Sequence, residues 1–226
     1  EECDTKLHPA GLTKLLTLYI VFSKIENGEI SLDEKVEVSR KASAELPAKL
    51  GLMPGQKIRV RYLIRSTGIM GSNDTSTALA EHVSGSEAEF SELMNLTAKQ
   101  LGMKNSSFLN AHGLTQTGHL STARDMAIVF RALYSDFPDY FHLFGRRVAS
   151  AGIKKVNHNG IRFLVNYRGA DAFKHGYTRA SGYNAAASAE RGNSRIITVM
   201  FGGRSIATRN RQMAKLSDLG FKKILR

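Results

Sequence analysis

Three short segments of the chain place basic, amide and hydroxyl side chains at spacings that suit a polar site. The first, His8-Pro-Ala-Gly-Leu-Thr-Lys14, sets Lys14 one helical turn after residue 11, on the same face of a strongly apolar helix. The second, Met70-Gly-Ser-Asn-Asp74, opens a helix predicted over residues 75–83. The third, Asp171-Ala-Phe-Lys-His-Gly-Tyr-Thr178, precedes a predicted strand. Each segment is a weak signal by itself.

Lys14 is the most informative of these side chains, because lysine is rarely buried without a partner. Burial and a neighbouring cation both lower the pKa of an ammonium group, so a lysine in a cleft can act as a general base. Asn73 fits either as a helix cap or as a cleft residue, and the two roles are compatible.

Taken in order, the three segments resemble the Ser-x-x-Lys, Ser-x-Asn and Lys-Thr-Gly motifs of penicillin-recognising serine acyltransferases. The resemblance is greatest to D-alanyl-D-alanine carboxypeptidases, the low-molecular-mass penicillin-binding proteins. It extends beyond the motifs to residues 73–86, 101–103, 119–126 and 176–184, and covers the chain from about His8 to its end.

Three motif positions depart from the family pattern. Gly11 stands where the family has its nucleophilic serine, Gly71 where the second motif has serine, and His175 where the third has threonine. The remaining motif positions match: Lys14, Asn73, Lys174 and Gly176.

The resemblance implies a role for each position. Lys14 would take the proton of the nucleophile, and the second-motif serine would relay it to the leaving amine. The backbone amides of Gly11 and Tyr177 would form the oxyanion hole. Lys174, with His175 in place of threonine, would hold the substrate carboxylate, and His175 is expected to titrate near neutral pH. Arg209 would add a cation for that carboxylate, unless it belongs to a basic surface.

Without a serine at residue 11, the family's acyl-enzyme cannot form. Loss of the nucleophile slows a serine hydrolase by roughly 10⁶. We therefore expect a pseudoenzyme that binds peptidoglycan stem peptides or β-lactams without covalent attachment, or an inactivated form of an active enzyme. The alternative is an active hydrolase with a displaced serine such as Ser72. A serine introduced at residue 11 is expected to restore slow acylation.

Composition adds a weaker indication of partners. The 226 residues include 32 Lys and Arg against 20 Asp and Glu, a formal charge of +12. This charge favours an anionic wall polymer or membrane surface, or simply a solvated basic surface. Nucleic-acid binding is a further alternative that rests on charge alone, because the sequence contains no helix-turn-helix, aromatic RNA motif or zinc finger.

No cofactor is expected. Cys3 is the single cysteine, which excludes an internal disulfide and a cysteine-built zinc site. The histidines other than His175 show no short-range metal-ligand spacing, so no metal is predicted: His8, His82, His112, His119, His142 and His158.

The predicted elements favour an α+β class with the β-lactamase/transpeptidase-like fold. Helices are expected over residues 12–26, 86–101, 122–133 and 209–219. Strands are expected over residues 35–38, 57–60, 162–167, 182–189 and 195–201, the last two joined by a hairpin turn.

The resemblance also implies an organisation and a location. Residues 1–27 and 150–226 would form an antiparallel sheet with terminal helices, and residues 28–149 a mainly helical insertion. Two strands of the family are expected upstream of residue 1, and no counterpart of the C-terminal β domain of some relatives is expected. The expected location is the bacterial periplasm or cell envelope, reached through a signal peptide that this chain lacks.

Overall fold

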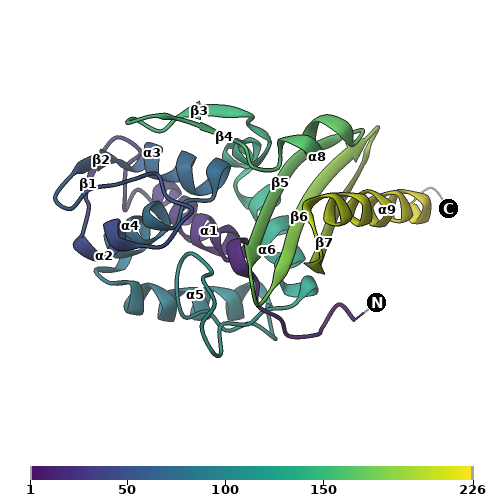
Figure 1. Cartoon of the computed structure of the whole chain (residues 1–226), viewed down its shortest axis with the longest axis horizontal. Helices are drawn as coiled ribbons and strands as arrows, with labels where there is room; N and C mark the ends of the chain where they lie inside the picture. The colour runs from purple at the N-terminus through teal and green to yellow at the C-terminus, as the bar shows by residue number, and fades with distance from the viewer. Residues whose placement is uncertain (1, 225–226) are drawn as a thin grey trace.

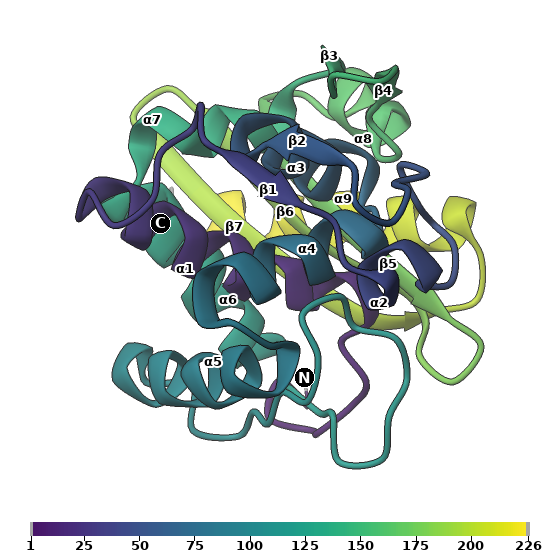
Figure 2. The same ribbon diagram turned by 90° about the vertical axis from the view of Figure 1, so that its left-hand side faces the viewer.

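A computed structural model describes residues 2–224 of the chain. It has a helical part, gathered around a central helix, and an antiparallel sheet with a long C-terminal helix across its outer face (Figure 1). Turned by 90°, the structure shows the sheet running behind the helical part (Figure 2). The fold class predicted from the sequence is confirmed.

Helical elements predominate in the first part of residues 2–224, and the three longest strands follow one another near its end. The helical elements are η1 (Ala10–Leu12), α1 (Thr13–Glu26), α2 (Arg40–Ala44), α3 (Val60–Arg65), η2 (Ser66–Met70), α4 (Asn73–Ser84), α5 (Glu87–Leu101), α6 (Ala123–Asp136), α7 (Pro138–Phe141), η3 (His142–Gly145), α8 (Ile161–Asn166) and α9 (Ile206–Ile224). The strands are β1 (Lys35–Glu37), β2 (Lys57–Arg59), β3 (Val148–Ser150), β4 (Lys155–Asn157), β5 (Ala170–Thr178), β6 (Gly182–Arg191) and β7 (Ser194–Gly203).

Helix α1 is the centre of the larger hydrophobic core. Its leucine, isoleucine, valine and phenylalanine side chains cover most of its circumference and are buried against α4, α5 and α6. A helix that is apolar nearly all round is stable only when other elements surround it. The helix ends at Glu26, and Gly28 follows with φ of +71°, as predicted for a C-terminal glycine.

Two further helices begin at the caps expected from the sequence. The Ser86 hydroxyl accepts a hydrogen bond from the Glu89 amide at the start of α5. The Thr122 hydroxyl does the same for the Asp125 amide at the start of α6. Each bond satisfies one of the amides that a helix N-terminus leaves free.

The main sheet has the order β5-β6-β7 and is antiparallel throughout. Successive residues of β6 face opposite sides, so Ala186 joins the larger core while Ala185 and Ala187 join a second core under α8 and α9. Met213 and Phe221 of α9 complete that second core. The sheet thus separates the helical part from α8 and α9.

Two sequence predictions near this sheet are wrong. Residues 161–166 form helix α8, because a helical turn buries Phe163, Leu164 and Tyr167 together while Val165 stays 55% exposed. Short apolar runs fit either periodicity, and here the packing decides. The segment 171–178, expected to precede a strand, itself lies within β5.

No helix among residues 2–224 combines the length and apolarity that crossing a bilayer would require.

Candidate functional site

The first segment lies at the junction of η1 and α1. Gly11 is half-buried in η1, and Ala10 before it has φ of +49°, a left-handed conformation that L-residues seldom adopt. Thr13, between Gly11 and Lys14, points away from Lys14, since its hydroxyl bonds to His119 Nε2 at 2.8 Å. Thr13 is thus no substitute for a nucleophile at residue 11.

Lys14 connects the first segment to the second. Its Nζ donates to Asn73 Oδ1 at 2.7 Å and to the carbonyl oxygen of His112 at 2.6 Å. The side chain is 2% exposed, and burial lowers the pKa of Lys14 to about 7, although Glu45 and Asp74 act in the opposite direction. At neutral pH a substantial fraction of Lys14 is therefore neutral, as a general base requires.

In the second segment, Gly71 has φ of +80° and directly follows the π-helix η2. The next residue, Ser72, is fully buried, and its hydroxyl lies 2.7 Å from the Ser66 hydroxyl. The Ser72 hydroxyl is thus buried and paired with another hydroxyl, so an attacking role for Ser72 would require this contact to break.

Asp74 fixes the second segment to the loop that precedes β2. Its carboxylate is fully buried and accepts hydrogen bonds from the amides of Leu50, Gly51 and Leu52 at 2.8–3.1 Å. Asn73 donates to the carbonyl oxygen of Leu46 at 2.9 Å in the same region. The side-chain amide of Asn73 is thus hydrogen-bonded both to Lys14 and to the Leu46 carbonyl oxygen.

The third segment lies on β5, where Lys174 points toward the helical part. Its Nζ donates to the carbonyl oxygens of Thr67 and Gly68 in η2, the latter at 2.9 Å. Burial, with a smaller effect from the Lys14 charge, holds the pKa of Lys174 well below its usual value. A Cβ atom on Gly71 would stand 3.7 Å from Lys174 Nζ, so the second and third segments meet here.

The first and third segments are also in close contact. Gly176 lies so near η1 that a Cβ atom on it would stand 2.1 Å from the Gly11 amide nitrogen. At the end of β5, Thr178 accepts a hydrogen bond from Thr115 at 2.9 Å, which ties the loop after Asn110 to the strand. Gly11, Lys14, Gly71, Asn73, Lys174 and Gly176 are therefore neighbours, from segments far apart in sequence.

His175 and Arg209 lie on the opposite face of β5 from Lys174. The His175 ring stacks on Phe173 at 6.4 Å, and the Arg209 guanidinium lies 5.1 Å from the same Phe173 ring. Burial, then Arg209, lowers the pKa of His175 to about 3, so the expected titration near neutral pH is wrong. Arg209 is 1% exposed and bonds Asn210 Oδ1.

Tyr177 differs from the other predicted site residues in being open to solvent. Its side chain is 53% exposed and packs on the Tyr183 ring, with 4.4 Å between the centroids. It follows Gly176 on β5, so its backbone lies next to the strand segment that contacts η1.

Several partners of these side chains carried no signal in the sequence. The carbonyl oxygens of Thr67, Gly68 and His112 bind the two buried ammonium groups, and any residue type supplies such an oxygen. Glu45, whose charge favours protonated Lys14, lies in an irregular segment 31 residues later in the sequence. Only the fold brings these groups to the site.

The arrangement provides two buried lysines, of which Lys14 is a candidate base, with glycine one helical turn before that base. The amino groups of Lys14 and Lys174 can donate hydrogen bonds to an anionic group, and Lys14 in its neutral form can accept a proton. The arrangement cannot form a covalent adduct through residue 11.

Comparison with known proteins agrees with this geometry. The family model for D-alanyl-D-alanine carboxypeptidase matches residues 1–205. The chain is 37% identical over 223 residues to D-alanyl-D-alanine carboxypeptidase DacF of Bacillus subtilis, covering 96% of the chain and 57% of the relative. It is also 37% identical to DacC of Escherichia coli, covering 97% of the chain and 56% of the relative.

Solved structures show the same architecture. Penicillin-binding protein 5 from Haemophilus influenzae superimposes with a TM-score of 0.92 at 31% identity, covering 98% of this chain and 66% of that one. DacD from Francisella tularensis gives a TM-score of 0.91 at 29% identity, with 96% and 65% covered. This chain thus spans little more than half the length of the curated relatives above, and it belongs to the D-alanyl-D-alanine carboxypeptidase family with the β-lactamase/transpeptidase-like fold.

Proposed function

We propose that this protein binds the D-alanyl-D-alanine end of peptidoglycan stem peptides, or β-lactams that resemble it, without forming an acyl-enzyme. The observation that carries the proposal is glycine at residue 11 beside an intact Lys14–Asn73 pair. The base and its amide partner remain, while the attacking oxygen has no counterpart.

Two features support a retained binding role. Lys14 and Lys174 place two hydrogen-bond donors, each positively charged when protonated, close to Gly11 and Gly71, which suits the terminal carboxylate of a peptide. Among solved relatives, penicillin-binding protein D2 from Listeria monocytogenes is known with ampicillin and with cefotaxime bound. An envelope location follows from the same proposal, since such a peptide occurs there.

A fluorescent penicillin tests the catalytic half of the proposal. The protein is incubated with the label and analysed by denaturing gel and mass spectrometry, beside an active D-alanyl-D-alanine carboxypeptidase. We expect no adduct on this protein and a stoichiometric adduct on the active enzyme. A stoichiometric adduct on this protein would overturn the proposal and identify the displaced nucleophile.

Ligand binding tests the other half. Nuclear magnetic resonance titration with a stem pentapeptide should move the Gly11, Gly71 and Tyr177 amide signals. The same peptide with its C-terminal carboxylate converted to an amide is the control, and should move them far less. Equal response to both peptides, or none to either, would contradict recognition of the carboxylate.

A further inference from the structure

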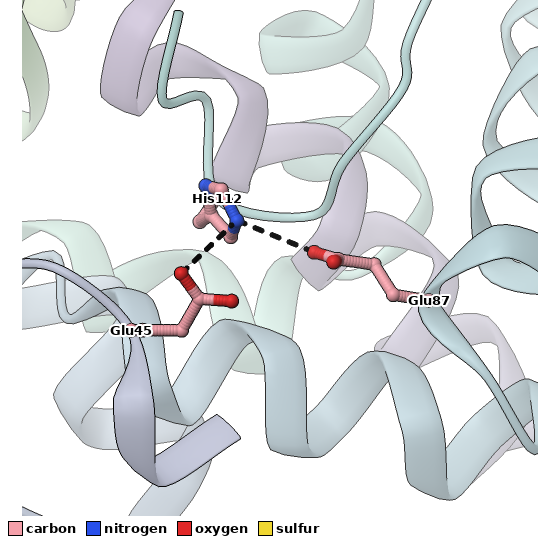
Figure 3. Close-up of side chains that lie close together, drawn as sticks. All are labelled: Glu45, Glu87 and His112. Carbon is pink, nitrogen blue, oxygen red and sulfur yellow. Dashed lines mark ion pairs between the residues drawn. The ribbon is translucent and has the colours of Figure 1, made fainter. Parts of the chain in front are cut away.

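Three side chains with little exposure lie together: Glu45, Glu87 and His112 (Figure 3). They come from the segment after α2, from the first turn of α5 and from the loop after Asn110. The backbone of His112 contacts Lys14. His112 Nε2 lies 3.5 Å from Glu45 Oε2 and 3.4 Å from Glu87 Oε1, and the side chains are only 7–12% exposed.

These separations are long for hydrogen bonds, which for N–H···O fall at about 2.7–3.2 Å. They match the separation of two ligand atoms around one tetrahedral ion. With bonds of about 2.0–2.2 Å to nitrogen and oxygen, the edges of the tetrahedron are about 3.4 Å. His112 Nε2 therefore faces one oxygen of each carboxylate at the long end of the range for such pairs. The three ligand atoms are close enough to contact a single ion placed between them.

The charge of the group also favours a cation. One neighbouring cation is Lys41, 2.8 Å from Glu87 Oε2, and its side chain is 56% exposed. Glu45 also interacts with Lys14, whose pKa of about 7 leaves it only partly protonated at neutral pH. The two carboxylates are therefore matched by one partly solvated and one partly neutral lysine. A divalent cation would compensate the charge of the carboxylates directly.

The surrounding contacts hold the carboxylates in place. Thr77 donates to Glu45 Oε1 at 3.0 Å, which leaves Oε2 toward His112. The Ala111 amide donates to Glu87 Oε1 at 3.0 Å. Such outer contacts orient the first ligands in known metal sites. A cavity of about 460 Å³, lined by Lys41, Glu87, Asn110, His112 and Thr115 among others, borders the group and offers room for a water ligand.

From this geometry we propose that Glu45, Glu87 and His112 form a binding site for a divalent cation, with Zn²⁺ as the best fit. One imidazole nitrogen and two carboxylate oxygens, with a fourth position toward a cavity, suit Zn²⁺ better than the oxygen-only preferences of Mg²⁺ or Ca²⁺. The site is distinct from the carboxypeptidase motifs. It touches them through His112, whose carbonyl oxygen binds Lys14 Nζ.

Binding has an identifiable structural consequence. The Leu114 amide lies 3.1 Å from His112 Nδ1, so the metal-free ring accepts at Nδ1 and carries its proton on Nε2. A cation at Nε2 needs that lone pair, so the proton moves to Nδ1 and the Leu114 contact breaks. The proposal therefore predicts weaker binding than a preformed site would give, and a marked shift of the Leu114 amide signal.

The test uses the tag-free protein as given by its sequence. Zn²⁺ affinity is measured by competition with a chromophoric chelator, and Co²⁺ by its visible absorption, which is intense for four-coordinate ions. We expect one Zn²⁺ per chain, a four-coordinate Co²⁺ spectrum, and movement of the Leu114 amide on Zn²⁺ addition.

Two matched variants locate the ion. Glu45→Gln keeps the size of the side chain and should weaken Zn²⁺ binding at least tenfold. His82→Gln is the control, because His82 lies outside the group and makes an ordinary 2.6 Å contact with Glu34. The Zn²⁺ affinity of this variant should equal that of the unmodified protein.

The unmodified protein decides the matter even if Glu45→Gln fails to fold. Absence of Zn²⁺ binding at 100-fold molar excess, or binding that leaves the Leu114 amide unmoved, would overturn the proposal. A folded Glu45→Gln variant that binds Zn²⁺ as tightly as the unmodified protein would also overturn the proposal.

Discussion

The carbonyl oxygen of His175 lies 2.7 Å from the point that a Cβ atom on Gly11 would occupy. Cβ atoms essentially never approach a heavy atom so closely, and this neighbour is backbone rather than a flexible side chain. A side chain at residue 11 therefore requires β5 or η1 to move. In this protein glycine at the nucleophile position also serves the packing between η1 and β5.

Gly11→Ala should destabilise the protein by roughly 1–3 kcal/mol, as overpacking of a close contact commonly does. Gly11→Ser should lose a similar amount and remain folded. Urea denaturation followed by circular dichroism measures both. If Gly11→Ala is as stable as the unmodified protein, β5 can move to admit the methyl group at no measurable cost. The close packing of η1 on β5 then contributes nothing to the free energy of unfolding.

Lys14 should make stability depend on pH. Its pKa in the folded protein is about 7, against about 10.5 when unfolded, so between these values the unfolded chain binds more protons. Stability should therefore rise with pH from about 7 to 10.5, and the penalty for burying the charge is fully present below pH 7.

The comparison with Lys14→Met isolates this contribution. The unmodified protein should gain stability relative to Lys14→Met as pH rises from 7 to 10, measured by urea denaturation at each pH. Lys174 is present in both proteins, so its own contribution to the pH dependence of stability largely cancels in the difference. A difference that is independent of pH would show that Lys14 is charged in the folded protein throughout.

Asp74→Asn should destabilise the protein by about 3 kcal/mol or more. The buried Asp74 carboxylate accepts three backbone amides of residues 50–52, and bonds to charged groups contribute about 1.5–3 kcal/mol each. An asparagine would turn an NH₂ group toward at least one of these donors. Asp139→Asn, on the exposed surface of α7, is the control and should change stability little. Equal urea midpoints for both variants would contradict the proposed clamp.

Much of this fold could be predicted from sequence because local signals agree with it. Ser86 and Thr122 cap their helices as expected, and the apolar circumference of residues 12–26 correctly placed α1 in the core. Helix α8 could not be predicted, because an apolar run of six residues fits a strand equally well until Phe163 and Tyr167 are packed.

The candidate site likewise contains features that the sequence predicted and features that it did not. The pairing of Lys14 with Asn73 follows from motifs that the sequence displays. The low pKa of His175 does not, because it depends on burial beside Arg209, which sequence spacing does not reveal. The group of Glu45, Glu87 and His112 has no motif at all, since its members lie 42 and 25 residues apart.

Gly71→Ser should itself be destabilising. Residue 71 has φ of +80°, and an L-residue in this left-handed region costs about 1–2 kcal/mol. The space is adequate, since a Cβ atom would meet only Lys174 Nζ, at 3.7 Å. The loss should thus be smaller than for a change that also creates a clash, and urea denaturation of Gly71→Ser beside Gly11→Ser checks the order. A larger loss for Gly71→Ser would show that backbone strain outweighs the contact with His175.

Restoration of activity should require all three departures to be reversed. Gly11→Ser alone places a hydroxyl one turn from Lys14 and should give slow acylation by a fluorescent penicillin. Release of D-alanine from a pentapeptide should become measurable only when Gly71→Ser and His175→Thr are added. Groups that act as a unit contribute little until the unit is complete.

Two controls make that experiment decisive. Lys14→Met in the triple variant should abolish both adduct and D-alanine release, because Lys14 is the candidate base one helical turn from residue 11. Activity that survives Lys14→Met would assign the base elsewhere. If the triple variant is folded and acylated yet releases no D-alanine, the contact of β5 with η1 blocks the peptide. In that case Gly11, with the strand packed against it, defines a site adapted to binding rather than turnover.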